Sequence, residues 1–210
     1  MKEELLNVEQ VTKRFGGLTA LDSVDLHVKK GEIVGLIGPN GAGKTTMFNA
    51  INGSFGITSG RIVYQGKDIT GLTPHERCQI GIGRTFQITK PFGGMTVLEN
   101  VAVGAIFGQK NRGNVLSSSL LQKSLSEAED ILEMMNFSNK KDAMAATLNV
   151  PGRKRLEICR ALATKPQLLL LDEVIAGLNP SEVGGMVELV KHVNELGITI
   201  LMIEHVMKAV

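Results

Sequence analysis

The chain has 210 residues, of which 43% are hydrophobic, enough for one packed core with a small additional subdomain. The net charge of +2 and the aromatic content of 4% argue against a nucleic-acid-binding surface, which needs a basic excess or stacking platforms. The longest apolar runs have the length of strands, so none could span a bilayer, and the first ten residues lack the apolar segment of a signal peptide.

The N-terminal third of the chain predicts strands joined by turns. Apolar and polar residues alternate over residues 5–15 and 23–28, which is the period of half-buried strands. Residues 32–38 predict a buried strand that ends in glycine, and a helix begins within residues 45–51. Residues 61–69 predict a further strand with a Gln-Gly turn.

The middle of the chain, from about Thr73 to Ala163, has the apolar spacing of helices. The segments with this spacing are residues 76–82, 97–108 and 119–135. Residues 108–119 predict a polar loop. Residues 148–159 place a proline, a glycine and three basic residues before an apolar helical pattern, so a helix starts there. Free N–H groups at such a start attract anions, but an ordinary basic surface helix is the alternative.

Strand character returns in the C-terminal part. Residues 167–173 predict an apolar strand, and residues 198–203 predict another. The helix between them has Asn179 as its N-cap, Pro180 as its first residue and Glu182 placed to close a capping box. The order of elements therefore predicts a core of parallel strands and helices, interrupted by a mostly helical insert.

The stretch GPNGAGKTT fits the phosphate-loop pattern G-x-x-x-x-G-K-[ST], and it follows a strand and opens a helix, as that pattern requires. Its glycines allow successive N–H groups to point toward an anion. Lys44 is expected to reach the β- and γ-phosphates, and the Thr45 hydroxyl is expected to bind Mg²⁺. The nucleotide-binding residues predicted here are Gly38, Pro39, Asn40, Gly41, Ala42, Gly43, Lys44, Thr45 and Thr46.

A second element of the site is predicted where the apolar strand LLLLDE ends. Ligands of α/β sheets bind at the carboxyl ends of the strands, and Asp172 and Glu173 lie at that end. Asp172 is expected to hold the Mg²⁺ shell, and Glu173 is expected to polarise an attacking water as a general base.

GTPases offer a competing interpretation, because they share the phosphate loop and carry D-x-x-G and N-K-x-D further along the chain. Residues 68–71 are DITG and residues 139–142 are NKKD, in the right order. Neither follows an apolar strand, which the GTPase site requires, so this interpretation is disfavoured.

The motifs resemble, in order and over essentially the whole chain, those of the ATP-binding subunits of ABC transporters. The resemblance implies an α/β fold with a P-loop NTPase core, an antiparallel N-terminal β portion and an inserted helical subdomain. Residues 1–86 and 164–210 would form the core and residues 87–163 the helical subdomain. It also implies three further site residues: Phe15 would stack on adenine, Gln87 would act at the metal and in catalysis, and His205 would contact the γ-phosphate.

The resemblance gives residues 148–152 a role, because this family has a signature of the form L-S-G-G-Q at the corresponding helix start. That signature binds the γ-phosphate of ATP held by the opposite subunit, so Asn149 and Gly152 are predicted ATP contacts. Asn149 replaces the usual serine and Pro151 replaces a glycine. Val174 also departs from the family pattern, which has proline after Asp-Glu.

Within the family, residues 13–21, 81–105 and 176–180 resemble the ATPases of branched-chain amino-acid uptake systems. Urea or amide uptake, lipopolysaccharide export and a regulatory ABC ATPase without transport are the alternatives. The implied cofactors are ATP and Mg²⁺. The implied partners are transmembrane permease subunits, held near residues 87–100, and a second ABC ATPase subunit in a homo- or heterodimer, with no nucleic acid. The implied location is the cytoplasmic face of the inner (plasma) membrane, as a peripheral subunit. The family usually continues for two more strands and a helix, so we expect a shortened chain.

Overall fold

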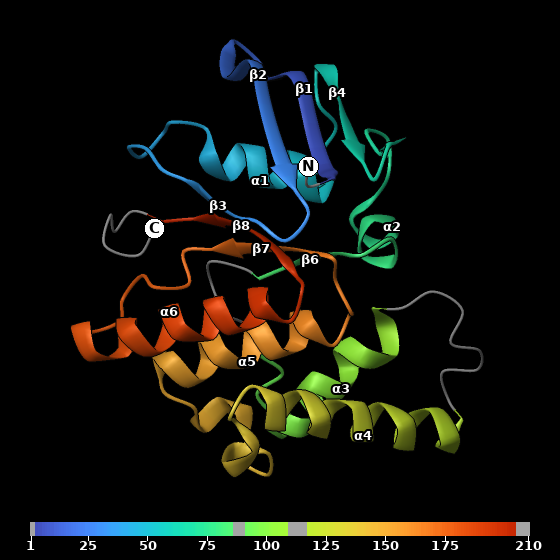
Figure 1. Cartoon of the computed structure of the whole chain (residues 1–210), viewed down its shortest axis with the longest axis vertical. Coiled ribbons are helices and arrows are strands. Elements are labelled where there is room, and N and C mark those ends of the chain that lie inside the picture. The colour runs from blue at the N-terminus through green and yellow to red at the C-terminus, as the bar shows by residue number, and fades with distance from the viewer. Residues whose placement is uncertain (1–2, 86–90, 109–116, 205–210) are drawn as a thin grey trace.

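The computed structural model describes residues 3–85, 91–108 and 117–204 (Figure 1). Gln87, His205 and most of the predicted polar loop at residues 108–119 therefore lie outside the described residues. The described strands form two sheets of four strands each, one antiparallel and one parallel. This arrangement, with helices on the far side of the parallel sheet, confirms the predicted α/β architecture.

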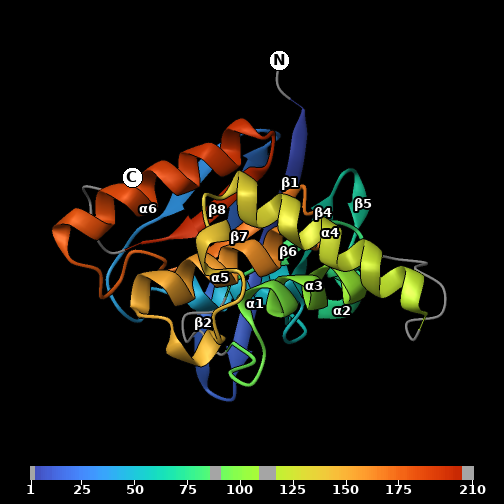
Figure 2. The ribbon, with the colours of Figure 1, turned by 90° about the horizontal axis from the view of Figure 1, so that it is seen from below.

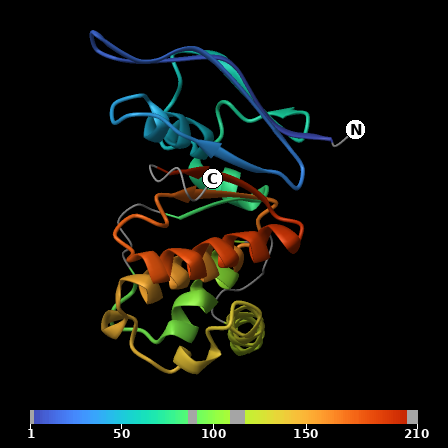
Figure 3. The ribbon, with the colours of Figure 1, turned by 60° about the vertical axis from the view of Figure 1, so that its left-hand side comes forward.

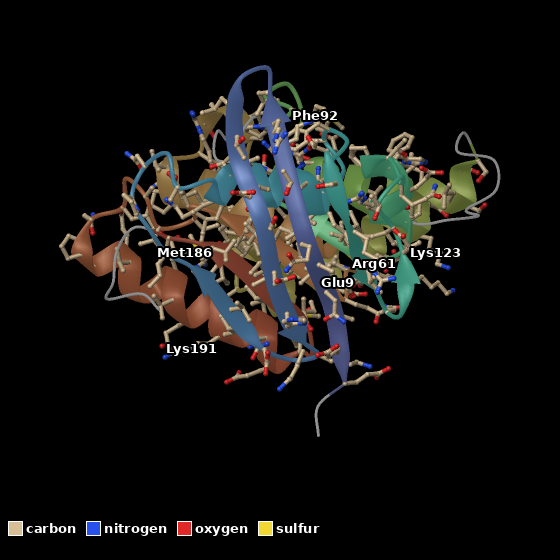
Figure 4. All side chains as sticks on the ribbon, turned by 90° about the horizontal axis from the view of Figure 1, so that it is seen from above. Glu9, Arg61, Phe92, Lys123, Met186 and Lys191 are labelled. Carbon is tan, nitrogen blue, oxygen red and sulfur yellow. The ribbon has the colours of Figure 1, made fainter. Side chains whose placement is uncertain are left out.

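The antiparallel sheet has the strand order β2-β1-β4-β5. Its strands are β1 (Glu4–Phe15), β2 (Leu18–Lys29), β4 (Ser59–Tyr64) and β5 (Lys67–Asp68). Its inner face is apolar, and its outer face carries polar cross-strand pairs. Glu9 on β1 lies opposite Arg61 on β4, and their side chains form an ion pair of 2.5 Å on the face seen in Figure 4.

The parallel sheet has the order β3-β8-β7-β6, built from β3 (Ile33–Leu36), β6 (Ile82–Arg84), β7 (Leu168–Asp172) and β8 (Thr199–Ile203). Every residue of β7 and β8 is buried, because both faces of this sheet are covered. Alternate residues of β7 contribute to two different hydrophobic cores, one on each face. Parallel strands covered on both sides read as continuous apolar runs, which explains the sequence LLLLD.

The helices form layers around these sheets (Figures 2 and 3). Helix α1 (Lys44–Asn52) lies between the two sheets, and α5 (Val150–Leu162) and α6 (Pro180–Glu195) cover the other face of the parallel sheet. Helices α3 (Val97–Phe107) and α4 (Ser118–Met134) form a further layer beyond them. The short 3₁₀ turns η1 (Ser138–Lys140) and η2 (Ala145–Thr147) connect α4 to α5.

The prediction of helical structure over residues 76–82 is wrong at its C-terminal end. Helix α2 (Pro74–Gln79) stops there, and Gly81, with φ of +99°, turns the chain into β6, which pairs in parallel with β7. A three-residue strand is too short to show a period of its own, so its apolar residues were absorbed into the helical spacing. The capping box predicted at Asn179 and Glu182 is confirmed.

The close approach of α3 to α5 and the residues after it depends on two glycines, one within α3 and one at its C-cap. A Cβ atom at Gly104 would lie 2.4 Å from the carbonyl oxygen of Arg160, and one at Gly108 would lie 2.5 Å from Cβ of Thr164. Contacts this short admit only glycine, so the two helices pack with their main chains nearly in contact. This packing holds α5 in place on the sheet.

A buried arginine fixes the C-terminal end of α1. Arg77 is 1% exposed, and its guanidinium donates hydrogen bonds to five main-chain carbonyl groups. These acceptors belong to Ala50, Ile51, Ile69, Thr70 and Leu72. Burial lowers the pKa of Arg77 to about 10, so the group stays charged at neutral pH and interacts favourably with the negative end of the helix dipole.

Candidate functional site

The phosphate loop connects β3 to α1 through three glycines with positive φ: Gly38 (+155°), Gly41 (+83°) and Gly43 (+84°). Gly43 is required for a second reason, because a Cβ there would lie 2.6 Å from the carbonyl oxygen of Ala20. Within the described part of the chain, no side chain caps the N-terminus of α1, and its first turn has no acidic residue. The N–H groups of this helix end are therefore arranged to receive an anion.

Lys44, the first residue of α1, lies across this loop. Its Nζ donates to the carbonyl oxygens of Gly38 and Pro39, at 2.8 and 2.9 Å. An ammonium group has three donors, so one remains directed away from these two carbonyls. A cation and a helix N-terminus thus act at the same place, which is the electrostatic requirement of a polyphosphate site.

A cleft of about 370 Å³ joins the loop to residues from distant parts of the chain. Its described lining residues are Phe15, Leu18, Thr19, Ala20, Asn40, Gly41, Ala42, Gly43, Lys44, Thr45, Thr46 and Glu173. The structure therefore brings together most of the predicted nucleotide-binding residues with Glu173. Gly38 and Pro39 contribute through the carbonyl groups that hold Lys44.

Phe15 forms an aromatic wall of this cleft and is 46% exposed. Its ring meets the ring of Phe55 edge-on, with centroids 5.3 Å apart. Nζ of Lys13 lies 4.8 Å from the Phe15 ring and 4.7 Å from the Phe55 ring. Phe15 is thus supported on one side and leaves the rest of its surface for a planar ligand. Sequence reasoning missed Phe55, which has no motif around it.

Asp172 is buried at the carboxyl end of β7, where its carboxylate is fixed by Arg84 of β6. The Nη2 atom of Arg84 lies 3.0 Å from Oδ2 of Asp172, and Nη1 donates to the side chain of Asn49 on α1 at 2.6 Å. Among the described residues, Oδ1 of Asp172 has no hydrogen-bond partner although it is buried. A buried, oriented carboxylate oxygen without a partner is suited to the shell of a hard cation, so the residues present fit Mg²⁺.

Glu173 occupies a strained main-chain conformation, with φ of +51° in a residue that has a Cβ. Its N–H donates to the carbonyl oxygen of Ile203 at 3.1 Å. Its own carbonyl oxygen accepts from Nζ of Lys154 at 2.8 Å and from the N–H of Ala176 at 3.2 Å. Glu173 is half-buried and lines the cleft, so its carboxylate can accept a proton from a ligand or water bound there.

Asn149 and Gly152 are not among the described residues that line this cleft. Asn149 is the N-cap of α5, and its Oδ1 accepts the N–H of Gly152 at 3.0 Å. Pro151 has no N–H to donate. The guanidinium of Arg153 turns back onto its own chain, donating to the carbonyl oxygens of Leu148 and Ala146 at 2.8 and 3.1 Å. This helix start is capped by its own side chains.

The two GTPase-like motifs do not reach the cleft. Asp68 ends β5, and its Oδ1 accepts the N–H of Thr70 at 2.8 Å, which forms a local turn. Hydrogen bonds from the side chain and then the main chain of Thr70 lower the pKa of the Asp68 carboxyl group. Asn139 lies in η1, beside the C-terminal end of α4. Among the described residues, none from either motif lines the cleft, so the base pocket of a GTPase has no counterpart here.

Comparisons with known proteins agree with this geometry. The model of the ABC transporter family matches residues 21–176. The chain is 40% identical to the high-affinity branched-chain amino acid transport ATP-binding protein LivG of Salmonella typhimurium, over all of this chain and 85% of that protein. It is 38% identical to BraF, a protein of the same description from Pseudomonas aeruginosa, over all of this chain and 85% of the relative.

Solved structures of similar proteins share the whole fold. A nucleotide-free ATP-binding cassette from an ABC transporter superimposes with a TM-score of 0.88 at 36% identity, covering 98% of this chain and 83% of that one. The ADP conformation of an ATP-binding cassette gives a TM-score of 0.86 at 37% identity, with the same coverage. Among the described residues, no helix has both the length and the apolar character needed to cross a membrane.

Proposed function

The chain belongs to the ABC transporter family, and from that premise we propose that it energises a permease that imports branched-chain amino acids. It is an ATPase of this family, in which ATP hydrolysis drives transport. The observation that carries the choice of solute is its similarity to LivG and BraF proteins named for branched-chain amino-acid transport, at 37 to 40% identity over at least 96% of this chain.

The cleft supports a specific assignment of roles toward ATP. Phe15 would stack on adenine, and the N-terminus of α1 would receive the phosphates, with Lys44 turning its free donor to the β- and γ-phosphates. Thr45 and Asp172 would hold Mg²⁺, with Gln87 as a further ligand. When bound, Mg²⁺ neutralises charge on the phosphates.

Glu173 is the proposed general base for the attacking water, because its side chain lines the cleft. His205 would contact the γ-phosphate, and Gln87 would join catalysis from the entry to the helical subdomain. Both follow from the family motifs, since they lie outside the described residues. We keep residues 87–163 as the proposed helical subdomain.

Pairing with a second ABC ATPase subunit is the proposed assembly, since cassettes of this family dimerise. In a head-to-tail pair, Asn149 and Gly152 would face the ATP of the other subunit. The internal hydrogen bond between them and the missing N–H of Pro151 leave that side with few donors. We therefore propose unequal sites when the partner carries a regular signature, with turnover mainly on this chain's own phosphate loop.

The permease would dock at a groove of about 350 Å³ between α2, β6, α3 and α5. Its wall includes Phe107, which is 57% exposed, and its floor carries Arg84, Glu157 and Arg160. The guanidinium of Arg160 in this groove lies 4.8 Å from the ring of Phe92, which belongs to residues 87–100, the segment that the family uses to hold its permease. A peripheral position on the cytoplasmic face of the membrane follows from such docking.

The solute is tested by uptake. The permease subunits that co-purify with this chain are identified first, and their genes are expressed with it in cells that lack their own branched-chain amino-acid ATPase. Labelled leucine, urea and a short amide are then offered separately. Leucine uptake that disappears with Lys44→Ala supports the proposal. Urea or amide uptake with no leucine uptake would reassign the solute while leaving the ATPase in place.

A further inference from the structure

Helix α5 contacts the site through the side chain of Lys154. This residue follows Asn149 by little more than one helical turn, is half-buried, and donates from Nζ to the carbonyl oxygen of Glu173 at 2.8 Å. Burial lowers the pKa of the Lys154 ammonium group, while the carboxylates of Glu204 and Glu173 act in the opposite direction. A half-buried cation held by a main-chain carbonyl between two carboxylates has a defined position.

The position of Lys154 matters because the main chain of Glu173 is strained. A residue with φ of +51° remains in that conformation only when its surroundings hold it. The N–H of Glu173 is held by Ile203 at the end of β8, and its carbonyl oxygen is held by Lys154 and by the turn to Ala176. The hydrogen bond from Lys154 ties this peptide group to helix α5.

Glu204 fixes the segment that follows Glu173. It lies directly after β8, is 1% exposed, and accepts the N–H of Ile175 at 3.1 Å through Oε1. The carboxylate of Glu204 favours the charged form of Lys154. The main chain of residues 173–175 is thus held by a cation from α5 and by a carboxylate that directly follows β8.

We propose that Lys154 is a positioning residue that aims the Glu173 carboxylate into the cleft and couples the start of α5 to hydrolysis in the same chain. The inference rests on the proposed role of Glu173 as the base. Because α5 begins at the signature stretch, a displacement of that end by the partner's nucleotide would move Lys154 and the main chain of Glu173. One helix would then link the two ATP sites of a dimer.

The test is steady-state hydrolysis of Mg-ATP by the full chain carrying Lys154→Met, with the binding of a fluorescent ATP analogue measured in parallel. We expect kcat to fall about tenfold to a hundredfold, because a base displaced by about 1 Å loses that much. KM and analogue affinity should stay within about twofold, because the variant does not touch the groups that bind ATP. Lys154→Arg, which keeps the charge and the donor, should recover most of kcat.

The matched control is Lys165, which lies just after the C-terminal end of α5. Lys165 pairs with Glu127 at 3.3 Å, away from the cleft, so Lys165→Met should keep the parent kcat. If the Lys154→Met variant does not fold, Lys154→Gln is measured in its place. Because glutamine keeps a neutral donor, Lys154→Gln should lower kcat less than Lys154→Met does. Parent kcat in the methionine or glutamine variant would overturn the inference, as would a loss of kcat with an equal loss of ATP affinity.

Glu173→Gln separates this inference from the proposed function. If Glu173→Gln keeps the parent kcat, the assignment of the base fails, and with it the role of Lys154. If Glu173→Gln abolishes turnover and Lys154→Met does not lower it, only the role of Lys154 fails. When both lower kcat, the double variant should be no slower than Glu173→Gln alone, because Lys154 acts through that carboxylate. A further loss in the double variant would contradict positioning.

Discussion

Two helix N-termini in this chain are proposed to bind phosphate, one of its own ATP and one of a partner's, and they are built in opposite ways. At α1 the N-cap is Gly43, no described side chain caps the helix, and the first residue is Lys44. At α5 the N-cap is Asn149, whose side chain accepts the N–H of Gly152, and a proline occupies the first turn. The first end keeps its donors for a ligand, whereas the second satisfies them within the chain.

A helix start attracts anions only to the extent that its own sequence leaves donors available. Three groups near the start of α5 could meet a phosphate: the side chain of Asn149, the N–H of Gly152 and the guanidinium of Arg153. The N–H of Gly152 donates to Oδ1 of Asn149, and two nitrogens of the Arg153 guanidinium donate to main-chain carbonyl groups, so these donors already have partners within the chain. This difference supports our proposal that the chain binds ATP at its own phosphate loop and offers few donors to a partner's site.

The largest effect is expected from Glu173→Gln, which leaves both helix ends intact and removes the base. General-base catalysis contributes about a hundredfold to ten-thousandfold, so kcat for ATP should fall by a comparable factor. ATP affinity should remain near that of the parent, because the amide has almost the same shape. Steady-state ATPase and equilibrium binding measured on one preparation check both statements. Near-parent turnover would mean that Glu173 is not the base, and the α1 end would then no longer mark the hydrolytic site.

Lys44→Ala tests the α1 end directly. A charge-assisted hydrogen bond contributes ~1.5–3 kcal/mol, so ATP should bind about tenfold to a hundredfold more weakly. Lys191→Ala on the exposed face of α6 removes the same charge away from the cleft and should leave affinity unchanged (Figure 4). Titration calorimetry with Mg-ATP measures both. Equal affinities for parent and Lys44→Ala would remove the phosphate loop from the site.

Much of this comparison could be predicted from the sequence, because both helix starts are local patterns. The phosphate loop is a run of nine residues, and β7 is recognisable as a continuous apolar run that is followed by Asp-Glu. The self-capping of α5 was also accessible, since asparagine is a strong N-cap residue. Because the family has serine at this position, Asn149 was interpreted as a replacement of that serine and not as an N-cap.

The remaining parts of the site depend on contacts between distant segments. Arg84 meets Asp172 across 88 positions of the chain, and no local pattern marks such a pair. Lys154 and Glu173 lie on different elements, and their contact exists only after α5 packs beneath the sheet. Strand β6 was missed because three residues have no period of their own. Long-range pairing, rather than local propensity, decides all three.

Gly104→Ala tests whether the packing of α3 against α5 holds α5 in place. The new methyl group would meet the carbonyl of Arg160, so the unfolding free energy should fall by ~1–3 kcal/mol, as overpacking does. Gly184→Ala is the matched control, because Gly184 is an exposed residue of α6 and no atom lies within 4 Å of its Cβ position. There, alanine should stabilise the helix by ~0.5–1 kcal/mol. Urea denaturation of both variants measures the opposite signs, and a stabilising Gly104→Ala would show that α3 does not hold α5.

The smallest effects are expected at the α5 end itself, where stability and function can be separated. Asn149→Ala removes the cap and should cost ~1 kcal/mol of unfolding free energy, without changing the affinity of the chain for its own ATP. Asn149→Ser combined with Pro151→Gly replaces the amide cap with a hydroxyl cap and adds a main-chain donor, so stability should stay within ~1 kcal/mol of the parent. In a complex with a partner that carries a regular signature, this double variant should raise hydrolysis on the partner's phosphate loop, because the start of α5 then offers the N–H that proline lacks.

Placing Glu173→Gln in the same chain silences its own site, so the remaining ATPase reports the partner's site alone. No gain in that background, with the unfolding free energy intact, would mean that the donors missing from α5 do not limit the second site, and the difference between the two helix ends would then concern binding rather than turnover.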